Sequence, residues 1–254
     1  WLPIGYPWHL LDANEYFLKN VFQPEVLGEV HSAAHITGPV HIGRGTVVRP
    51  GSVIDGPVCI GEDCSIGPNC WIRPGSTIGN HCRVGQGVEI KNSILMDGSM
   101  VSHLTYVGDS VVGEHANLGC GTITSNFRHD GGNHKSMVNG KLIDTARRKL
   151  GAIIGDEVHT GINTSIYPGR KLWPCATTRP GEIVSRDIVF EQCLHPSISF
   201  PDSHLWLIPP ISGIWKTVSM FDSGNRQIRK RRAGYERNNA FETQGIPSVP
   251  AYMR

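Results

Sequence analysis

A strict six-residue repeat constrains this chain more than any other feature. An aliphatic residue returns at every sixth position, at Ile36, Ile42, Val48, Ile54, Ile60, Ile66, Ile72, Ile78, Val84 and Ile90. Gly directly follows five of them, and small or medium residues, among them Cys64, Cys70 and Cys82, stand four positions after several. Neither the helical period of 3.6 nor the strand period of two accounts for a period of six.

Three short strands joined by tight turns do account for it, with one hexad per strand and three hexads per coil. The fold class expected is all-β, a parallel β-helix built from hexapeptide repeats. Residues 18 apart, such as Ile36, Ile54, Ile72 and Ile90, should then stack on one wall. Each buried Ile contributes about 1.5–3 kcal/mol to stability. The three cysteines are expected to fill the core rather than bind metal or take part in redox chemistry.

The repeat is interrupted once. Its register slips after Ile90 and resumes through Val101, Val107, Val112 and Leu118. Residues 127–150 break it, and we expect an excursion loop there, with a tight hairpin turn at Val138-Asn139-Gly140-Lys141. Loops of this length are usually functional. The six-residue spacing then returns at Ile154, Thr160, Ile166, Leu172, Thr178 and Val184.

The two ends lack the repeat. Residues 7–22 predict an amphipathic helix with Pro7 early and an apolar stripe of Leu10, Leu11, Phe17 and Val21. We therefore divide the chain into residues 1–24, a β-helix over 25–188, and an irregular tail over 189–254. The tail contains the basic run Arg229 to Arg232, which is expected to be a solvated surface.

Composition limits the setting and the partners. The sequence contains no apolar run near the roughly 20 residues that cross a membrane and no secretory segment. Its seven cysteines include no CxxC pair, which favours a reduced, cytoplasmic setting over a disulfide framework. With 24 Lys and Arg against 22 Asp and Glu, nothing indicates binding to nucleic acid.

Motifs in residues 72–127 resemble a known family. They are an RPG at 73–75, an E-x-K at 89–91, SHLTY at 102–106, N-x-G-x-GT at 117–122 and T-x-N-Phe at 124–127. The segment is similar to the acetyltransferase domain of the bifunctional enzyme that makes UDP-N-acetylglucosamine. Residues 144–163 resemble its archaeal branch, which couples sugar-1-phosphate nucleotidylyl transfer to acetylation of an amino sugar. Residues 1–24 look like a helix left from the junction with an absent nucleotidyltransferase domain.

The resemblance implies a left-handed β-helix that forms a homotrimer with no membrane partner. It also implies N-acetylation of an amino-sugar 1-phosphate, such as glucosamine-1-phosphate or galactosamine-1-phosphate, by acetyl-CoA in UDP-N-acetylhexosamine synthesis. His103 matches the catalytic base. An imidazole titrates near neutral pH and suits the removal of a proton from the substrate ammonium before the amine attacks the thioester.

Other site residues carry over from the same motifs. The substrate positions are Arg73, Lys91, Tyr106, Asn117 and Asn126, and the acetyl-CoA positions are Cys120, Asn126, Phe127, Ile162 and Pro180. Pro180 has no N–H, so it cannot act as a backbone donor. The family's C-terminal cofactor arginine has no recognisable match, and Arg147, Arg148 and Lys149 are alternative sources of charge for the CoA phosphates. No metal is implied.

Two other interpretations remain. The first is a metal enzyme of the γ-carbonic anhydrase type, because His129 and His134 are five residues apart, although the third ligand position is Ser93. The second is a non-catalytic β-helix that serves as an oligomerisation or regulatory platform for a sugar nucleotidyltransferase.

Overall fold

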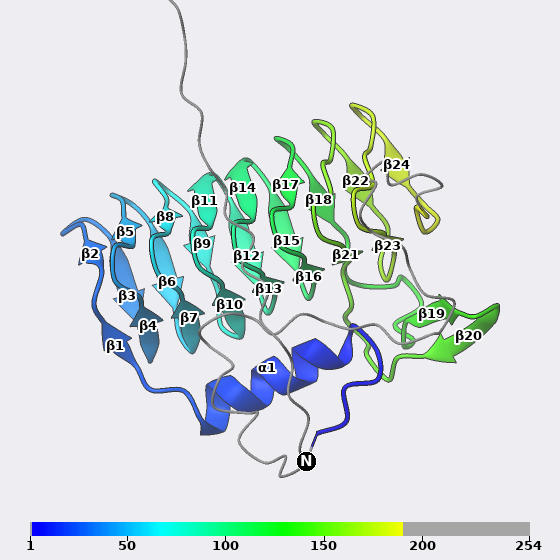
Figure 1. Cartoon of the computed structure of the whole chain (residues 1–254), viewed down its shortest axis with the longest axis horizontal. Coiled ribbons are helices and arrows are strands. Elements are labelled where there is room, and N and C mark those ends of the chain that lie inside the picture. The colour runs from blue at the N-terminus through cyan, green and yellow to red at the C-terminus, as the bar shows by residue number, and fades with distance from the viewer. Residues whose placement is uncertain (1, 190–254) are drawn as a thin grey trace, which may run out of the picture. The chain divides into compact units, whose positions relative to one another are not determined.

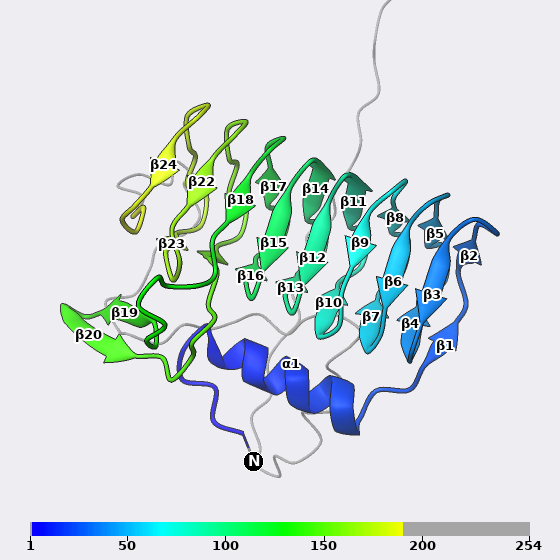
Figure 2. The ribbon, with the colours of Figure 1, turned by 180° about the vertical axis from the view of Figure 1, so that it is seen from behind.

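The computed structural model describes residues 2–189, which all belong to one compact unit. Apart from Val189, the expected tail over 189–254 and its basic run lie outside the described residues. Three parallel sheets make up most of this unit, each taking one strand from successive coils (Figures 1 and 2). The predicted all-β fold of stacked hexapeptide coils is therefore confirmed. No described helix is long and apolar enough to cross a membrane.

The sheets are named here A, B and C after their order within a coil. Sheet A contains β1 (Glu25–Val26), β4 (Val40–Ile42), β7 (Val58–Ile60), β10 (Ser76–Ile78), β13 (Ile94–Leu95), β16 (Val111–Val112), β21 (Ile153–Ile154) and β23 (Lys171–Leu172). Sheet B contains β2 (Glu29–Val30), β5 (Val47–Val48), β8 (Ser65–Ile66), β11 (Arg83–Gln86), β14 (Met100–His103) and β17 (Asn117–Leu118). Sheet C contains β3 (His35–Thr37), β6 (Val53–Asp55), β9 (Trp71–Ile72), β12 (Glu89–Lys91), β15 (Tyr106–Gly108), β18 (Ile123–Thr124), β22 (Ser165–Ile166) and β24 (Ile183–Val184).

The repeat residues line the interior as predicted. In sheet C, Ile36 pairs with Ile54, Ile54 with Ile72, and Ile72 with Ile90, so the four residues form one ladder. The last three are fully buried, while Ile36 at the first coil is only partly covered. Cys64, Cys70 and Cys82 are also buried in this core, as expected. Apolar burial is thus distributed evenly along the stack.

Polar residues occupy some later interior positions. Thr160 and Thr178 stand where the repeat would place an aliphatic residue, and their hydroxyl groups bond to those of Thr122 and Thr164 respectively. Because each hydroxyl meets another, these four hydroxyl groups are satisfied, and the coil continues without a break. Isolated bridges at His159 and Thr177 extend sheet B past β17.

The N-terminal helix α1 (His9–Asn20) covers the outer face of sheet A (Figure 2). Leu10 and Leu11 pack with Trp8 against Ile94 and Val111, and Phe17 packs near Cys59 further along the sheet. A buried asparagine on the same face, Asn14, donates to the Gly75 carbonyl and accepts from the Thr77 hydroxyl.

The prediction is wrong for one member of the helical stripe, Val21. The helix ends at Asn20, and Val21 is its C-cap with a non-helical backbone, so this side chain is 37% exposed. Leu18 is buried instead. Capping bonds from the Val21 and Phe22 amides to the Phe17 carbonyl end the helix before the stripe reaches Val21.

The excursion loop contains an antiparallel hairpin, β19 (Lys135–Val138) and β20 (Lys141–Asp144). Asn139 and Gly140 both have positive φ, as a two-residue hairpin turn requires, which confirms the predicted turn. Val138 and Ile143 pack against the cluster around α1. The loop is therefore held to the same side of the unit as the helix.

We predict that Ile72→Ala lowers the free energy of unfolding by about 2–5 kcal/mol, because it leaves a cavity in the fully buried ladder. Chemical denaturation followed by circular dichroism measures this change. Ile183→Ala is the matched control, since Ile183 is 62% exposed, and a change as large as that of Ile72→Ala would contradict the ladder as the source of stability.

Candidate functional site

The carboxyl ends of the sheet C strands bring two cations together. Glu89 pairs with Trp71 and Ile90 with Ile72, so Lys91 lies one coil above Arg73. Adjacent parallel strands are about 4.8 Å apart. The repeat length thus aligns two positive side chains on one edge of the β-helix, named here the C–A edge because it leads from sheet C to sheet A.

A cavity of about 430 Å³ lies along this edge. Its lining residues are Arg73, Lys91, Tyr106, Asn126, Phe127 and Lys149. Five of these six carry a polar or charged group, and three are cations. Such a lining favours an anionic ligand that also has hydroxyl groups.

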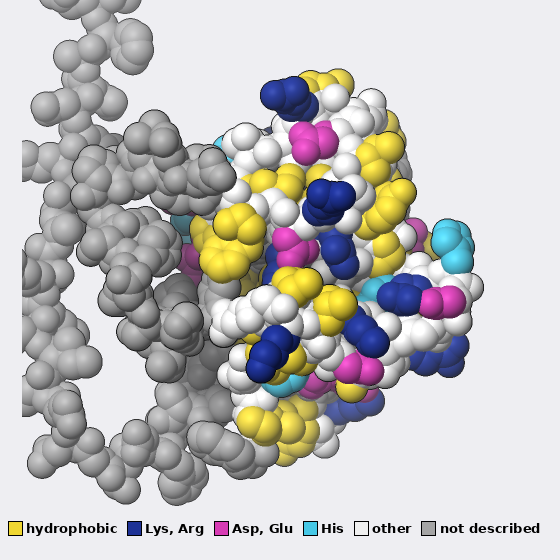
Figure 3. All heavy atoms as spheres, turned by 90° about the vertical axis from the view of Figure 1, so that its right-hand side faces the viewer, with side chains coloured by type: hydrophobic (Ala, Val, Ile, Leu, Met, Phe, Trp, Pro, Cys, Tyr) yellow, Lys and Arg dark blue, Asp and Glu magenta, His cyan; other side chains and the backbone are white. Residues whose placement is uncertain are grey.

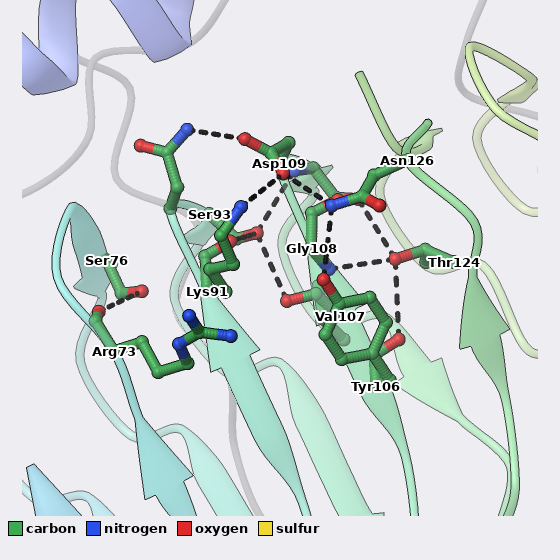
Figure 4. A network of polar contacts seen from close by, with 12 residues as sticks. Arg73, Ser76, Lys91, Ser93, Tyr106, Val107, Gly108, Asp109, Thr124 and Asn126 are labelled. Carbon is green, nitrogen blue, oxygen red and sulfur yellow. Dashed lines mark hydrogen bonds and ion pairs between the residues drawn. The ribbon is translucent and has the colours of Figure 1, made fainter. Parts of the chain in front are cut away.

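A buried carboxylate, Asp109, organises the cavity floor (Figure 4). It accepts hydrogen bonds from Lys91 Nζ at 3.0 Å, from Asn92 Nδ2 at 2.7 Å and from Asn126 Nδ2 at 2.5 Å. The Asp109 side chain is 3% exposed and that of Lys91 is 19% exposed. A shielded pair of this kind fixes its members more firmly than a surface pair does.

The Tyr106 side chain completes this network from the outer face of sheet C. Its hydroxyl accepts a hydrogen bond from Asn126 Nδ2 at 3.1 Å. Gly108 makes this position possible, because a Cβ there would lie 2.3 Å from the Tyr106 hydroxyl oxygen and 2.8 Å from Asn126 Nδ2. Burial raises the pKa of Tyr106, and the charges of Asp109 and Glu89 raise it further. The phenol is therefore neutral at physiological pH and can donate a hydrogen bond.

Arg73 is positioned by two neighbours. Its Nη1 lies 2.7 Å from Glu89 Oε1, and its guanidinium lies 4.6 Å from the centre of the Trp71 ring. The indole nitrogen of Trp71 in turn donates to Asp55. A stacked and paired guanidinium keeps its planar donors in a fixed direction.

Sequence analysis missed Glu89 and Asp109. The carboxylate of Glu89 holds Arg73. Its place in the E-x-K motif was a signal in the sequence that could have identified it. Asp109 gave none, because a single Asp after Gly108 resembles an ordinary turn residue. Its φ of 49° is indeed that of a tight turn.

The three basic residues 147–149 were suggested as charges for the CoA phosphates, but their side chains make contacts in three different places. Arg147 pairs with Asp12 on α1, and Arg148 Nε donates to the Gly131 carbonyl. Lys149 alone lines the cavity, because its backbone forms a bridge with Phe127 at the base of the excursion loop. Lys149 makes no ion pair with any described residue, so it supplies positive charge that is not compensated.

The remaining candidates lie on another edge. His103 ends β14 in sheet B and is exposed, and it does not line the cavity. The Gly121 amide donates to the His103 carbonyl, the Asn163 amide to the Cys120 carbonyl and the Gly181 amide to the Ile162 carbonyl. His103, Cys120 and Ile162 therefore occupy successive turns of the edge from sheet B to sheet C, named here the B–C edge.

Pro180 precedes Gly181 on the next turn of the same edge, and Asn117 begins β17 in sheet B. In the coil of His103, strand β15 of sheet C runs from this edge to the C–A edge, and its first residue, Tyr106, lines the first cavity. Gly108, which pairs with Lys91, is five residues beyond His103, a span of up to about 17 Å. His103 and the two cations therefore lie on different edges of the chain, and His103 is not among the residues that line the first cavity.

The residues of the metal interpretation lie in different settings. His129 is exposed and His134 is buried, while the Ser93 hydroxyl donates to the Lys91 carbonyl. Within residues 2–189, no group of three or more His, Cys, Asp or Glu side chains could hold a metal ion.

Comparison with known proteins shows what this chain is similar to. Residues 54–170 match the family model described as the GMPPB C-terminal domain. The bifunctional sugar-1-phosphate nucleotidylyltransferase/acetyltransferase of Sulfurisphaera tokodaii is 43% identical over 188 residues, covering 74% of this chain and 47% of that protein. The bifunctional protein GlmU of Methanococcus maripaludis is 43% identical over 195 residues, covering 77% and 47%.

A weaker likeness, with a TM-score of 0.37 and 11% identity, relates 65% of this chain to 69% of the UDP-N-acetylglucosamine acyltransferase of Campylobacter jejuni. The fold and the cavity define this chain as a hexapeptide β-helix with a cationic edge that also carries a phenol and an amide. It is a homologue of the bifunctional sugar-1-phosphate nucleotidylyltransferase/acetyltransferases, as the motifs indicated. The chain spans about half the length of these curated relatives.

We predict that Asp109→Asn lowers the free energy of unfolding by about 1–3 kcal/mol at pH 7, because Lys91 loses its shielded carboxylate. Thermal and urea denaturation measure this change. Asp63→Asn is the matched control: it is the same exchange at a similar turn backbone, but the Asp63 side chain is 59% exposed. Equal effects of the two substitutions would show that the shielded pairing of Asp109 with Lys91 does not contribute to stability.

Proposed function

We propose that this chain transfers an acetyl group from acetyl-CoA to the amine of an amino-sugar 1-phosphate. The observation that carries the proposal is the meeting of Arg73, Lys91, Tyr106 and Asn126 in one cavity. Cations suit the phosphate, and the phenol and amide suit the sugar hydroxyls. The name of the Sulfurisphaera tokodaii relative, which includes sugar-1-phosphate and acetyltransferase, supports this choice.

The reaction needs a base and an oriented amine, and no protein nucleophile. We assign the base to His103, whose imidazole accepts a proton from the substrate ammonium. The freed amine attacks the thioester carbonyl, a C–N bond forms, the C–S bond breaks, and the CoA thiolate leaves and takes up a proton. Holding both substrates in place supplies much of the acceleration.

The two-edge arrangement leads us to propose that the complete site forms between chains of a homotrimer. The C–A edge of one chain would contribute Arg73 and Lys91, and the B–C edge of a neighbour would contribute His103. Helix α1 covers the outer face of sheet A, which leaves sheets B and C to meet other chains. We assign the acetyl-CoA contacts to Asn126 and Phe127 on the first edge, and to Cys120, Ile162 and Pro180 on the second. Asn117 remains a proposed substrate contact.

The purified chain should release free thiol from acetyl-CoA when glucosamine-1-phosphate or galactosamine-1-phosphate is present. His103→Ala should lower kcat by about 10²–10⁴, the usual contribution of a general base. His129→Ala is the control, since His129 is exposed and lies outside the first cavity. A stable chain that is inactive with both sugars would contradict the proposal and favour the non-catalytic platform.

Mixing two inactive variants tests whether chains share the site. If each site takes its base and its cations from different chains, then His103→Ala and Lys91→Ala chains coexpressed in equal amounts should recover about a quarter of the wild-type activity. Each variant alone should be inactive. If every site lay within one chain, no mixture would recover activity, because each chain would carry one lesion.

A further inference from the structure

The structure points to a second anion-binding site that is separate from the first cavity. A cavity of about 250 Å³ lies between the excursion loop and the last described coils. It is lined by Arg128, His134, Lys135, Tyr167, Pro168, Arg170 and Ser185. Its volume equals that of several water molecules at about 30 Å³ each, so a phosphate group fits. We propose that this cavity binds phosphate groups.

Charge is the first observation. Three of the lining residues are cations, and none of the seven is Asp or Glu. Arg128 is held by Asp130 through its Nε and Nη2 atoms, and Arg170 lies 4.0 Å from Asp187. Lys135 makes no ion pair with another described residue. The two arginines are therefore positioned by carboxylates outside the cavity, and the Lys135 charge remains uncompensated.

An unsatisfied buried atom is the second, independent observation. His134 is 2% exposed, and its Nε2 has no hydrogen-bond partner in the described part of the chain. Leaving such a group unpaired costs about 1–3 kcal/mol, so native structures usually satisfy it with protein, water or an ion. His134 lines the cavity together with the three cations, so an anion bound there lies next to the residue with this unpaired atom.

The electrostatics of His134 agree with this reading. Burial lowers the pKa of His134, the backbone groups of Asn126 and Arg148 raise it in part, and the nearby charges of Arg128 and Arg170 lower it, so the net shift is downward. The imidazole is thus neutral at pH 7 and can donate one hydrogen bond without adding charge. The hydroxyl groups of Tyr167 and Ser185 add two more donors at the rim.

The fold explains why these residues meet. Tyr167 follows β22 and Ser185 follows β24, so both lie on the C–A edge, further along the stack than Asn126. The excursion loop brings Arg128, His134 and Lys135 to this edge, where Gly169 approaches the His134 side chain. Figure 3 looks onto the end of the unit that carries β24, where several Lys and Arg side chains are spread among acidic and hydrophobic ones. The proposed site needs only one chain and does not depend on acetyl transfer.

Calorimetric titration with orthophosphate, pyrophosphate, CoA and dephospho-CoA tests the proposal. The full chain carrying Arg73→Ala and Lys91→Ala serves as the parent, so that the first cavity contributes little. We expect at least one of these probes to bind. Lys135→Ala, and separately Arg128→Ala, should weaken binding by about tenfold, as loss of a charged hydrogen bond does.

Lys141→Ala is the matched control, because Lys141 lies on the same hairpin but does not line the cavity. Binding of pyrophosphate or orthophosphate would identify free phosphate as an occupant. Binding of CoA alone would identify the phosphates of CoA, and a weaker response to dephospho-CoA would assign the 3′-phosphate. The proposal is overturned if no probe binds, or if Lys141→Ala weakens binding as much as Lys135→Ala does. Both results are independent of whether the parent chain transfers acetyl groups.

Discussion

The stacking of inward aliphatic residues at a fixed repeat is the constraint on which the rest of the structure depends. Each coil sits directly over the one before it, so every outward position has a neighbour one sheet spacing away. Rows of outward side chains are therefore as regular as the core. Arg73 and Lys91 become neighbours because Ile72 and Ile90 are, and this places two like charges together without any local bond between them.

Two like charges on one edge require compensation, and each has its own carboxylate. Glu89 pairs with Arg73 in a half-exposed setting, while Asp109 pairs with Lys91 under nearly complete cover. Asp109 also holds Asn126, a residue 17 positions later. The buried aspartate thus links successive coils and sets the direction of a cation and an amide at once, which is how a shallow edge acquires a defined cavity floor.

The accessory segments determine which surfaces of the β-helix remain available. Helix α1 and the hairpin share one apolar cluster over sheet A, and the ion pair of Arg147 with Asp12 joins the loop to the helix. This attachment holds the base of the loop, so that Phe127 and Lys149 form a bridge beside the first cavity. The same loop carries His134 and Lys135 to the second cavity. One excursion therefore supplies residues to both basic cavities.

The sequence by itself determined the coil, its core and its interruption. A six-residue period has few structural solutions, and the regular spacing of the aliphatic residues identifies the inward positions. It also indicated the hairpin turn, since Asn139-Gly140 suits positive φ. It could not show the end of the helical stripe at Val21, the burial of Asp109 or the unpaired nitrogen of His134. Only the tertiary structure decided these, and it also placed His103 and Lys91 on different edges. Burial and hydrogen-bond partners depend on contacts between residues far apart in the chain, which the periodicity of the sequence does not relate.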